Sequence, residues 1–259
     1  PGVETTTGPL GQGLANAVGM AIAEKSLASE FNKKGHNLID HYTYVFSGDG
    51  CLMEGISHEV CSLAGTLGLN KLILIYDMNN ISIDGDISIA FTENIEKRFE
   101  SYGWNVINNI DGHDFGSIEQ SISRAKRELS KPTIICMKTT IGCGSPNKQG
   151  TSGIHGAPLG ESEVLLTRKN LGWEFKPFHI PKYIYKEWDA KKSGKTLEQN
   201  WNKQLNSYKK SYPKLYTELQ RRLKNKLPSS FTKKIDSLIE KNDKSMATRK
   251  SSQVVLEHI

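Results

Sequence analysis

Short apolar segments alternate with helical segments through the first half of the chain. Residues 72–76 and 133–138 are almost unbroken apolar runs that are too short for helices, and residues 41–46 and 104–107 are rich in β-branched and aromatic side chains. Strands that have no polar face must be covered on both sides, and strands that alternate with helices pair in parallel. The sequence therefore predicts an α/β fold, a parallel sheet with helices on both faces.

The segments between these strands have the spacing of helices. Between residues 11 and 31, Leu14, Val18 and Ile22 recur every four residues, which predicts a helix with one apolar face. Residues 54–67 and 117–129 are also predicted to be helical. After Gly160 the chain becomes polar and is interrupted by prolines, which predicts that an α-helical extension follows the sheet. We predict an α/β domain over residues 1–160, a helical extension and linker over 161–245, and the start of a further domain over 246–259.

Charge is distributed unevenly along the chain, whose net charge is +6. Residues 168–259 contain 22 Lys and Arg against 9 Asp and Glu, whereas the residues before them contain 12 against 19. The basic residues alternate with Leu, Tyr and Trp at helical spacing and lack the patterns of nucleic-acid-binding modules. We expect a solvated helical surface and no nucleic-acid partner.

The first residues of the chain and the length of its apolar runs indicate the cellular compartment. No apolar run reaches the length of a membrane span, and the first residues lack the features of a signal peptide. We expect a cytoplasmic protein that makes no membrane contact. The sequence opens at Pro1 without a methionine, from which we expect an internal fragment of a longer protein.

The cysteines allow two interpretations. Cys51, Cys61, Cys136 and Cys143 form no Cys-x-x-Cys pair, so we predict reduced residues that serve packing. The alternative is a metal cluster, because five candidate ligands fall within 26 residues: His36, His41, Cys51, His58 and Cys61. Their irregular spacing disfavours a structural zinc site, whose ligands are usually paired closely around a turn.

Two polar residues follow predicted strands at a spacing of thirty residues, Asp49 within Gly48-Asp49-Gly50 and Asn79. Because a βαβ unit has about this length, both side chains should lie beyond the carboxyl ends of adjacent parallel strands, where open α/β sheets bind ligands. A carboxylate, a carboxamide and a backbone carbonyl, which Ile81 could offer, suit Mg²⁺. Neither a P-loop nor a dinucleotide-binding glycine motif is present.

Several segments resemble transketolases of the bacterial type. The Gly48-Asp49-Gly50 motif with Asn79 resembles the thiamine diphosphate signature, which by itself specifies only the cofactor. Further segments specify transketolase among the enzymes that use this cofactor: residues 5–13, 48–58, 82–85, 111–114, 144–148 and 155–160. The likeness runs through almost the whole chain and implies the thiamine-diphosphate-binding fold, with its N-terminal part missing and residues 246–259 as the truncated start of a pyrimidine-binding domain.

The resemblance implies roles for individual residues. It implies that the side chains of Asp49 and Asn79 and the carbonyl of Ile81 bind Mg²⁺, for which Ca²⁺ or Mn²⁺ can substitute. It also implies contacts with the cofactor and the second subunit: Gly50 donates its N–H to the diphosphate, Gly8, Pro9 and Leu10 lie against the aminopyrimidine, His155 reaches the diphosphate and the reacting sugar, and Glu54 couples two active sites at a dimer interface. From the residues alone, Glu54 would be an acid at a helix start and Gly8-Pro9 an ordinary turn.

The implied activity is that of transketolase. A homodimer would transfer a two-carbon ketol unit from a ketose phosphate to an aldose phosphate in the non-oxidative pentose phosphate pathway, acting on xylulose 5-phosphate, ribose 5-phosphate and erythrose 4-phosphate. The glutamate that activates the aminopyrimidine and the groups that hold the sugar phosphate are absent from this sequence, so we expect the chain to be inactive alone. Two alternatives stay open, a non-catalytic Mg²⁺-diphosphate-binding subunit of a split thiamine enzyme and a deoxyxylulose-phosphate synthase-like enzyme.

Overall fold

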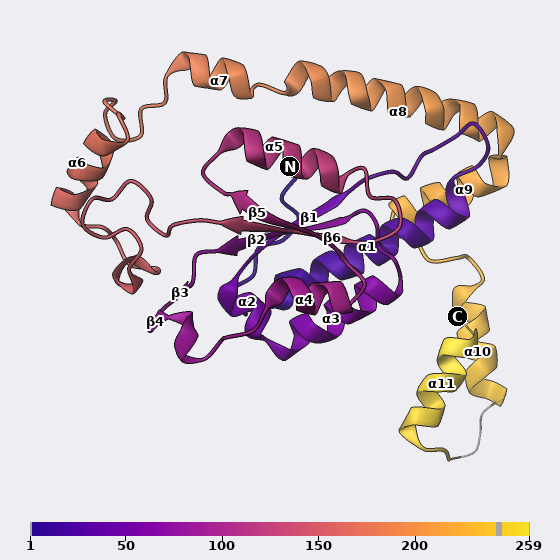
Figure 1. Cartoon of the computed structure of the whole chain (residues 1–259). Helices are drawn as coiled ribbons and strands as arrows, with labels where there is room; N and C mark the ends of the chain where they lie inside the picture. The colour runs from indigo at the N-terminus through magenta and orange to yellow at the C-terminus, as the bar shows by residue number, and fades with distance from the viewer. Residues whose placement is uncertain (1, 242–244, 259) are drawn as a thin grey trace. The chain divides into compact units, whose positions relative to one another are not determined.

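A parallel sheet forms the centre of the α/β part of the protein. The computed structural model describes residues 2–241 and 245–258. The sheet consists of four strands, β1 (Thr43–Gly48), β2 (Leu72–Met78), β5 (Asn105–Asp111) and β6 (Thr133–Lys138). Their order in the sheet is β1-β2-β6-β5 and all pairings are parallel (Figure 1). The prediction of a parallel α/β sheet is confirmed.

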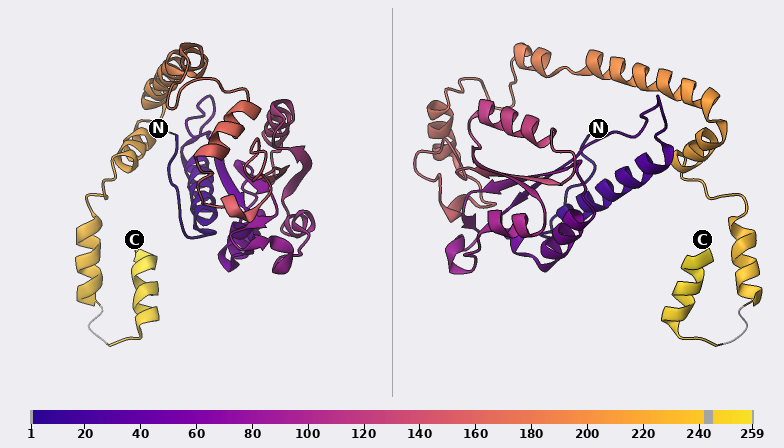
Figure 2. Two further views of the ribbon diagram at one scale, coloured as in Figure 1. Left: turned by 90° about the vertical axis from the view of Figure 1, so that its left-hand side faces the viewer. Right: turned by 45° about the vertical axis from the view of Figure 1, so that its right-hand side comes forward.

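Helices cover both faces of this sheet. On one face lie α1 (Gln12–Phe31), α3 (Gly55–Thr66) and α4 (Ile95–Ser101), and on the other lies α5 (Phe115–Ala125), as Figure 2 shows. Leu72, Leu74 and Tyr76 of β2 belong to the first core, whereas Ile73 and Ile75 belong to the second. Because successive strand residues point to opposite faces, a strand buried on both faces must be apolar at every position.

A short hairpin connects β2 to α4. It consists of β3 (Ile81–Ser82) and β4 (Gly85–Asp86), which pair antiparallel, followed by the 3₁₀ turn η1 (Ile87–Ile89). The Asp86 carboxylate accepts a hydrogen bond of 2.8 Å from the Ser88 N–H and so caps η1. A further short helix, α2 (Asp49–Met53), begins directly where β1 ends. The hairpin, α2 and α4 were not predicted from the sequence.

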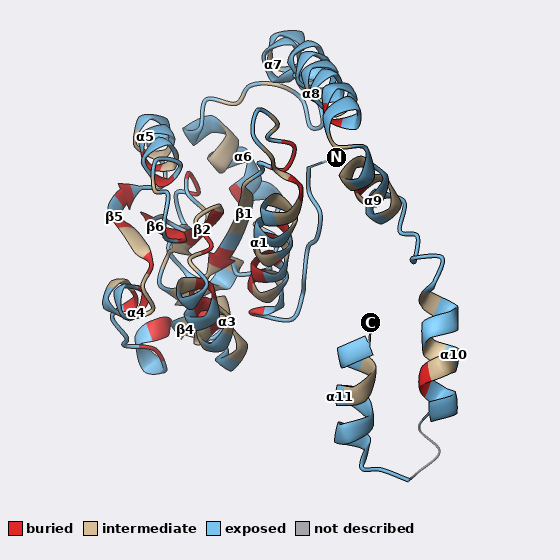
Figure 3. Ribbon diagram, turned by 90° about the vertical axis from the view of Figure 1, so that its right-hand side faces the viewer, coloured by how far each residue is buried: buried red, intermediate tan, exposed pale blue. Residues whose placement is uncertain are grey.

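The polar helices predicted after Gly160 are present. They are α6 (Glu161–Asn170), α7 (Lys182–Trp188), α8 (Lys191–Ser211), α9 (Pro213–Leu223), α10 (Phe231–Lys241) and α11 (Thr248–His258). Most of the α7, α8 and α11 surface is exposed, in contrast to the sheet (Figure 3). In the described part of the chain, no helix is both long and apolar enough for a membrane span.

The chain divides into two compact units. One contains the residues up to 32 together with 39–190, and the other contains residues 33–38 together with those from 191 onward. Within the second unit, the indole N–H of Trp201 donates to the Leu38 carbonyl at 2.9 Å, and His36 Nε2 lies 3.1 Å from Ser207 Oγ. The predicted domain boundaries at residues 160 and 245 stay predictions, and residues 1, 242–244 and 259 lie outside the described part.

Three predicted element bounds need correction. The first strand is Thr43–Gly48 rather than residues 41–46, and the strand predicted at 104–107 runs on to Asp111. That strand has a register shift between Ile107 and Ile110, where Asn109 has a φ of 56°. The polar bulge residues hid the continuation of the strand. The helix predicted over 117–129 is Phe115–Ala125, because Asp114 caps it earlier by accepting from the N–H groups of Gly116 and Ser117.

Candidate functional site

The carboxyl ends of β1 and β2 lie side by side at one edge of the sheet. Gly48, the last residue of β1, is in register with Asp77 of β2, so Asp49 and Asn79 follow adjacent strand positions. The Asn80 backbone N–H donates to Asp49 Oδ2 at 2.9 Å and joins the two strand ends directly. The structure thus places Asp49 and Asn79 at the same edge, as the spacing predicted.

Asp49 carries a buried carboxylate. The residue is only 3% exposed, its Oδ1 accepts a hydrogen bond from the Tyr76 hydroxyl and its Oδ2 accepts from the Asn80 N–H. Burial raises the pKa of Asp49 above its ordinary value, and the hydrogen bonds from Tyr76 and from the backbone of Asn80 and Asn79 oppose this only in part. Among the described residues, no Lys, Arg or His forms an ion pair with Asp49.

A buried carboxylate without a cation is unfavourable, with an effective penalty of several kcal/mol per buried ion. Two carboxylate oxygens offer about four acceptor positions, so the donors from Tyr76 and Asn80 leave room for a further ligand. This observation fits a divalent cation that prefers oxygen donors. The donor set and the missing counter-charge are therefore compatible with Mg²⁺ at Asp49.

The turn after β2 supplies the other candidate ligands. Asn79 Oδ1 accepts the Ile81 N–H at 3.0 Å, and Asn80 adopts the left-handed conformation with a φ of 61°. The Ile87 N–H donates to the Asn80 carbonyl at 3.1 Å and ties the turn to the hairpin. The backbone of this turn is thus tied to the Asp49 carboxylate through Asn80, and no hydrogen bond joins the Asn79 side chain to Asp49 among the described residues.

The alternative metal cluster does not form. Within the described residues, no group of three or more His, Cys, Asp and Glu side chains is arranged to hold a metal ion. His58 Nδ1 lies 2.9 Å from the Tyr102 hydroxyl and its Nε2 lies 3.0 Å from Arg98, so both ring nitrogens have protein partners.

The cysteines follow the packing prediction in part. Cys61 and Cys136 are buried free thiols, and burial raises the pKa of each to about 12. Cys51 is half-buried and Cys143 is exposed. The packing prediction is therefore wrong for Cys143, which lies in the polar loop after β6.

The segment before α1 lies against the start of α2 and α3. A Cβ atom added to Gly50 would lie 3.3 Å from Leu10 Cδ1, so the Leu10 side chain rests on Gly50. Gly11 has a φ of 77°, and a Cβ atom there would lie 2.8 Å from Ile56 Cγ2. Gly8 and Pro9 are exposed in the same segment. The structure thus brings Leu10 to the residue that follows Asp49.

Glu54 lies close to this segment. It is exposed and forms the N-cap position of α3, but its carboxylate makes no capping hydrogen bond. A Cβ atom on Gly11 would lie 3.1 Å from the Glu54 Cβ. The expected helix-start position is therefore observed, without a side-chain cap.

His155 lies in the long loop that follows β6. The loop begins beside the turn after β2, because the Thr139 N–H donates to the Met78 carbonyl at 3.3 Å. His155 follows the 3₁₀ turn η2 (Ser152–Ile154) and is exposed. Among the described residues, no hydrogen bond or ion pair joins the His155 ring to Asp49 or Asn79, although the His155 loop begins at the same edge of the sheet.

Sequence reasoning missed Glu163, which anchors the His155 loop. Its carboxylate accepts from the Ser145 hydroxyl and, at 2.9 Å each, from the backbone and side-chain N–H groups of Asn147. The Ser145 and Asn147 hydrogen bonds lower the pKa of Glu163. The segment 144–148, which looked like a family motif alone, therefore ties the loop to α6.

Arg98 was also missed, and it ties α4 to the helices beside Asp49. Its guanidinium lies 2.6 Å from Glu93 Oε2, 3.0 Å from His58 Nε2 and 3.0 Å from the Leu52 carbonyl. Leu52 belongs to α2, the helix that Asp49 opens. This half-buried arginine thus gives His58, at the end of the segment that begins with Gly48-Asp49-Gly50, a hydrogen-bonding partner.

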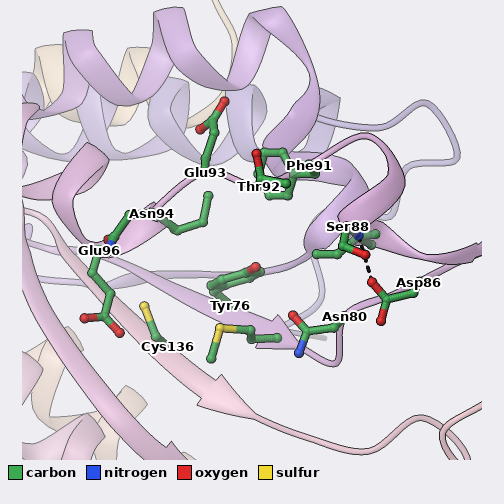
Figure 4. A pocket seen from close by; sticks show the side chains of 13 residues that line it. Tyr76, Asn80, Asp86, Ser88, Phe91, Thr92, Glu93, Asn94, Glu96 and Cys136 are labelled. Carbon is green, nitrogen blue, oxygen red and sulfur yellow. Dashed lines mark hydrogen bonds between the residues drawn. The ribbon is translucent and has the colours of Figure 1, made fainter.

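A cavity of about 480 Å³ lies between the hairpin, the start of α4 and the ends of β2 and β6. Tyr76 lies in its wall, between Cys136 and Asn80 (Figure 4). The remaining wall is mixed in character, with Phe91 and Ile87 beside Asp86, Glu93 and Glu96. The cavity therefore adjoins the Asp49 cluster through the tyrosine ring.

The fold and the site define an α/β domain of the class that binds ligands at the carboxyl edge of a parallel sheet. The family model described as "Transketolase, thiamine diphosphate binding domain" matches residues 1–228, and the chain belongs to this family.

Relatives and solved structures agree with this assignment. The chain is 59% identical to the transketolase of Buchnera aphidicola subsp. Schizaphis graminum, over 99% of this chain and 39% of that protein. It is 56% identical to transketolase 1 of Escherichia coli K12, again over 99% of this chain and 39% of the relative. A transketolase structure from Pichia stipitis in complex with sedoheptulose 7-phosphate matches with a TM-score of 0.90 at 42% identity, over 99% of this chain and 38% of that chain. The chain thus spans about 39% of the length of these curated relatives.

Proposed function

We propose that this chain is the diphosphate-binding part of a transketolase, which transfers a two-carbon ketol unit from a ketose phosphate to an aldose phosphate. The observation that carries the proposal is the buried Asp49 carboxylate, which has no cationic partner among the described residues and follows the carboxyl end of β1 in a domain of this family. The family assignment favours transketolase over the deoxyxylulose-phosphate synthase alternative.

Mg²⁺ would be held by the side chains of Asp49 and Asn79 and by the carbonyl of Ile81. The metal would neutralise the buried charge of Asp49, for which the protein offers only neutral donors. All three groups present oxygen, the donor that Mg²⁺ prefers, and phosphate oxygens and water complete such sites. Ca²⁺ or Mn²⁺ would occupy the same donors.

Thiamine diphosphate, when bound, supplies the carbanion chemistry of carbon–carbon bond cleavage. Gly50 would donate its backbone N–H to the diphosphate, since a residue without Cβ allows close approach. Leu10, which rests on Gly50, would form a wall against the aminopyrimidine together with Gly8 and Pro9. His155 would hydrogen-bond to the diphosphate and to the sugar substrate, which requires its loop to bring the exposed ring to the Asp49 cluster.

The proposed substrates are xylulose 5-phosphate, ribose 5-phosphate and erythrose 4-phosphate, and the related Pichia stipitis structures contain xylulose 5-phosphate and sedoheptulose 7-phosphate. We place the reaction in the non-oxidative pentose phosphate pathway of the cytoplasm and in a homodimer. Glu54 supports the dimer, because an exposed carboxylate without a capping hydrogen bond is available to a second subunit.

The test is ketol transfer from xylulose 5-phosphate to ribose 5-phosphate by the complete protein, with thiamine diphosphate and Mg²⁺ in excess. We expect a seven-carbon and a three-carbon product, and loss of turnover in Asp49→Asn and Asn79→Ala. Asp114→Asn is the matched control, because Asp114 caps α5 on the exposed surface and asparagine caps a helix equally well. Cofactor binding without any transfer would favour a non-catalytic subunit and refute the proposal.

A further inference from the structure

Tyr76 lies near the carboxyl end of β2 and is only 1% exposed. It is in register with Ser47 of β1, two residues before Asp49. Its ring faces the core on the side of α1 and α3 and lies in the cavity wall, while its hydroxyl donates to Asp49 Oδ1. A tyrosine hydroxyl is protonated at neutral pH, so it can act as a donor to this carboxylate.

The two oxygens of Asp49 are fixed from two different elements. Oδ1 is held by the Tyr76 hydroxyl of β2, and Oδ2 is held by the Asn80 N–H of the turn that follows. Two donors on separate oxygens determine the orientation of the carboxylate plane and leave the remaining lone pairs pointing in a defined direction. Without the hydroxyl, only the Asn80 turn would orient the group.

We propose that Tyr76 is a positioning residue, which holds the Asp49 carboxylate in the orientation that receives the divalent cation. The inference rests on the proposed function and adds to it a residue that acts through the Asp49 carboxylate. Phenylalanine would fill the same space in the core, so packing alone does not require a hydroxyl here. The hydroxyl of Tyr76 donates to Asp49, a buried carboxylate that has no cationic partner among the described residues.

The experiment compares Tyr76→Phe with the unmodified protein, both as the complete protein. The affinity for Mg²⁺ is measured by isothermal titration calorimetry at saturating thiamine diphosphate. Removal of a residue that orients a metal ligand typically weakens metal binding about 10- to 100-fold, and we expect a loss in this range. At saturating Mg²⁺, kcat should return to near the unmodified value, because the residue acts through Asp49 alone.

Tyr42→Phe is the matched control. Its hydroxyl donates to the Lys126 carbonyl at 3.2 Å, and the residue packs against the other core. This variant loses a tyrosine hydrogen bond at a distance from Asp49, so its Mg²⁺ affinity should be unchanged.

An unchanged Mg²⁺ affinity in Tyr76→Phe would overturn the inference, and so would an equal loss of Mg²⁺ affinity in Tyr42→Phe. Failure of ligand-free Tyr76→Phe to unfold cooperatively would also overturn it, because it would show that the hydroxyl is needed for the fold. The proposed function fails separately, if the unmodified protein shows no Mg²⁺-dependent binding of thiamine diphosphate at all.

Discussion

Asp49→Asn should make the ligand-free protein more stable. The same substitution should abolish the further stabilisation that Mg²⁺ and thiamine diphosphate provide. Among the described residues the carboxylate has no counter-charge, and burial, together with the nearby Asp77, raises its pKa against the hydrogen bonds it receives. Asparagine is nearly isosteric and keeps both contacts: its carbonyl oxygen can accept from the Asn80 N–H, and its amide can donate to the Tyr76 oxygen. The substitution therefore removes the charge and keeps a partner for each of the two polar atoms of residue 49, although the Tyr76 hydroxyl changes from donor to acceptor.

The expected magnitude follows from these opposing effects. Burial of an ion costs several kcal/mol, and a hydrogen bond to a charged group returns about 1.5–3 kcal/mol, so the two donors offset most of the penalty. We expect a gain of about 0.5–2 kcal/mol without ligands, the scale of single stabilising substitutions. With ligand at about a hundredfold excess over Kd, the unmodified protein should gain about 2.7 kcal/mol and Asp49→Asn nothing, so the order of stability reverses.

Thermal denaturation in EDTA and in Mg²⁺ with thiamine diphosphate measures both effects. For a unit of this size, each kcal/mol corresponds to about 2–4 °C in Tm. Asp114→Asn is the control, because this exposed cap should change neither Tm. An Asp49→Asn protein that is less stable than the unmodified protein in EDTA would refute the reasoning, since it would show that the charge is favourable in the empty site.

Three further outcomes are expected. Asn80→Gly should keep its stability in urea denaturation, whereas Asn80→Ala should lose about 1–2 kcal/mol, because φ is 61° there. Glu163→Gln should speed hydrogen exchange in residues 145–160. Since hydrogen bonds lower the Glu163 pKa, this protection is fully present above the ordinary pKa of 4.5 and is lost as the pH falls through the lowered pKa. Residues 81–91 should exchange more slowly once Mg²⁺ and thiamine diphosphate bind, and equal protection with and without them would contradict the proposed site.

The two central strands, β2 and β6, were predictable because burial on both faces leaves a clear pattern. In β2, alternate residues enter different cores, so the whole segment is apolar, and the same holds for β6. The order of the strands was not predictable, because no local signal shows that β6 lies between β2 and β5. The helix α4 has a cap, in which Asn94 accepts the Lys97 N–H at 2.9 Å, but its seven residues carry too little apolar periodicity to reveal it.

The site divides in the same way between local and distant signals. Asp49 and Asn79 were found because polar residues after strand ends are visible in the sequence and their spacing matches a βαβ unit. Tyr76 and Glu163 were missed, because their partners lie 27 and 18 residues away. A tyrosine within an apolar strand looks like a core residue, and only the folded sheet shows which group its hydroxyl reaches.

Unfavourable features are concentrated at the carboxyl edge of the sheet. Asp49 is buried without a counter-charge among the described residues, and Asn80 has a left-handed backbone. Both features cost stability without ligands, and a cation at Asp49 would relieve the first of them. Such a site couples folding to binding, because the ligand stabilises the state in which the buried charge is tolerated. Stability in EDTA and affinity for Mg²⁺ should therefore change in opposite directions when Asp49 loses its charge, and in the same direction when only Asn80 is changed to alanine.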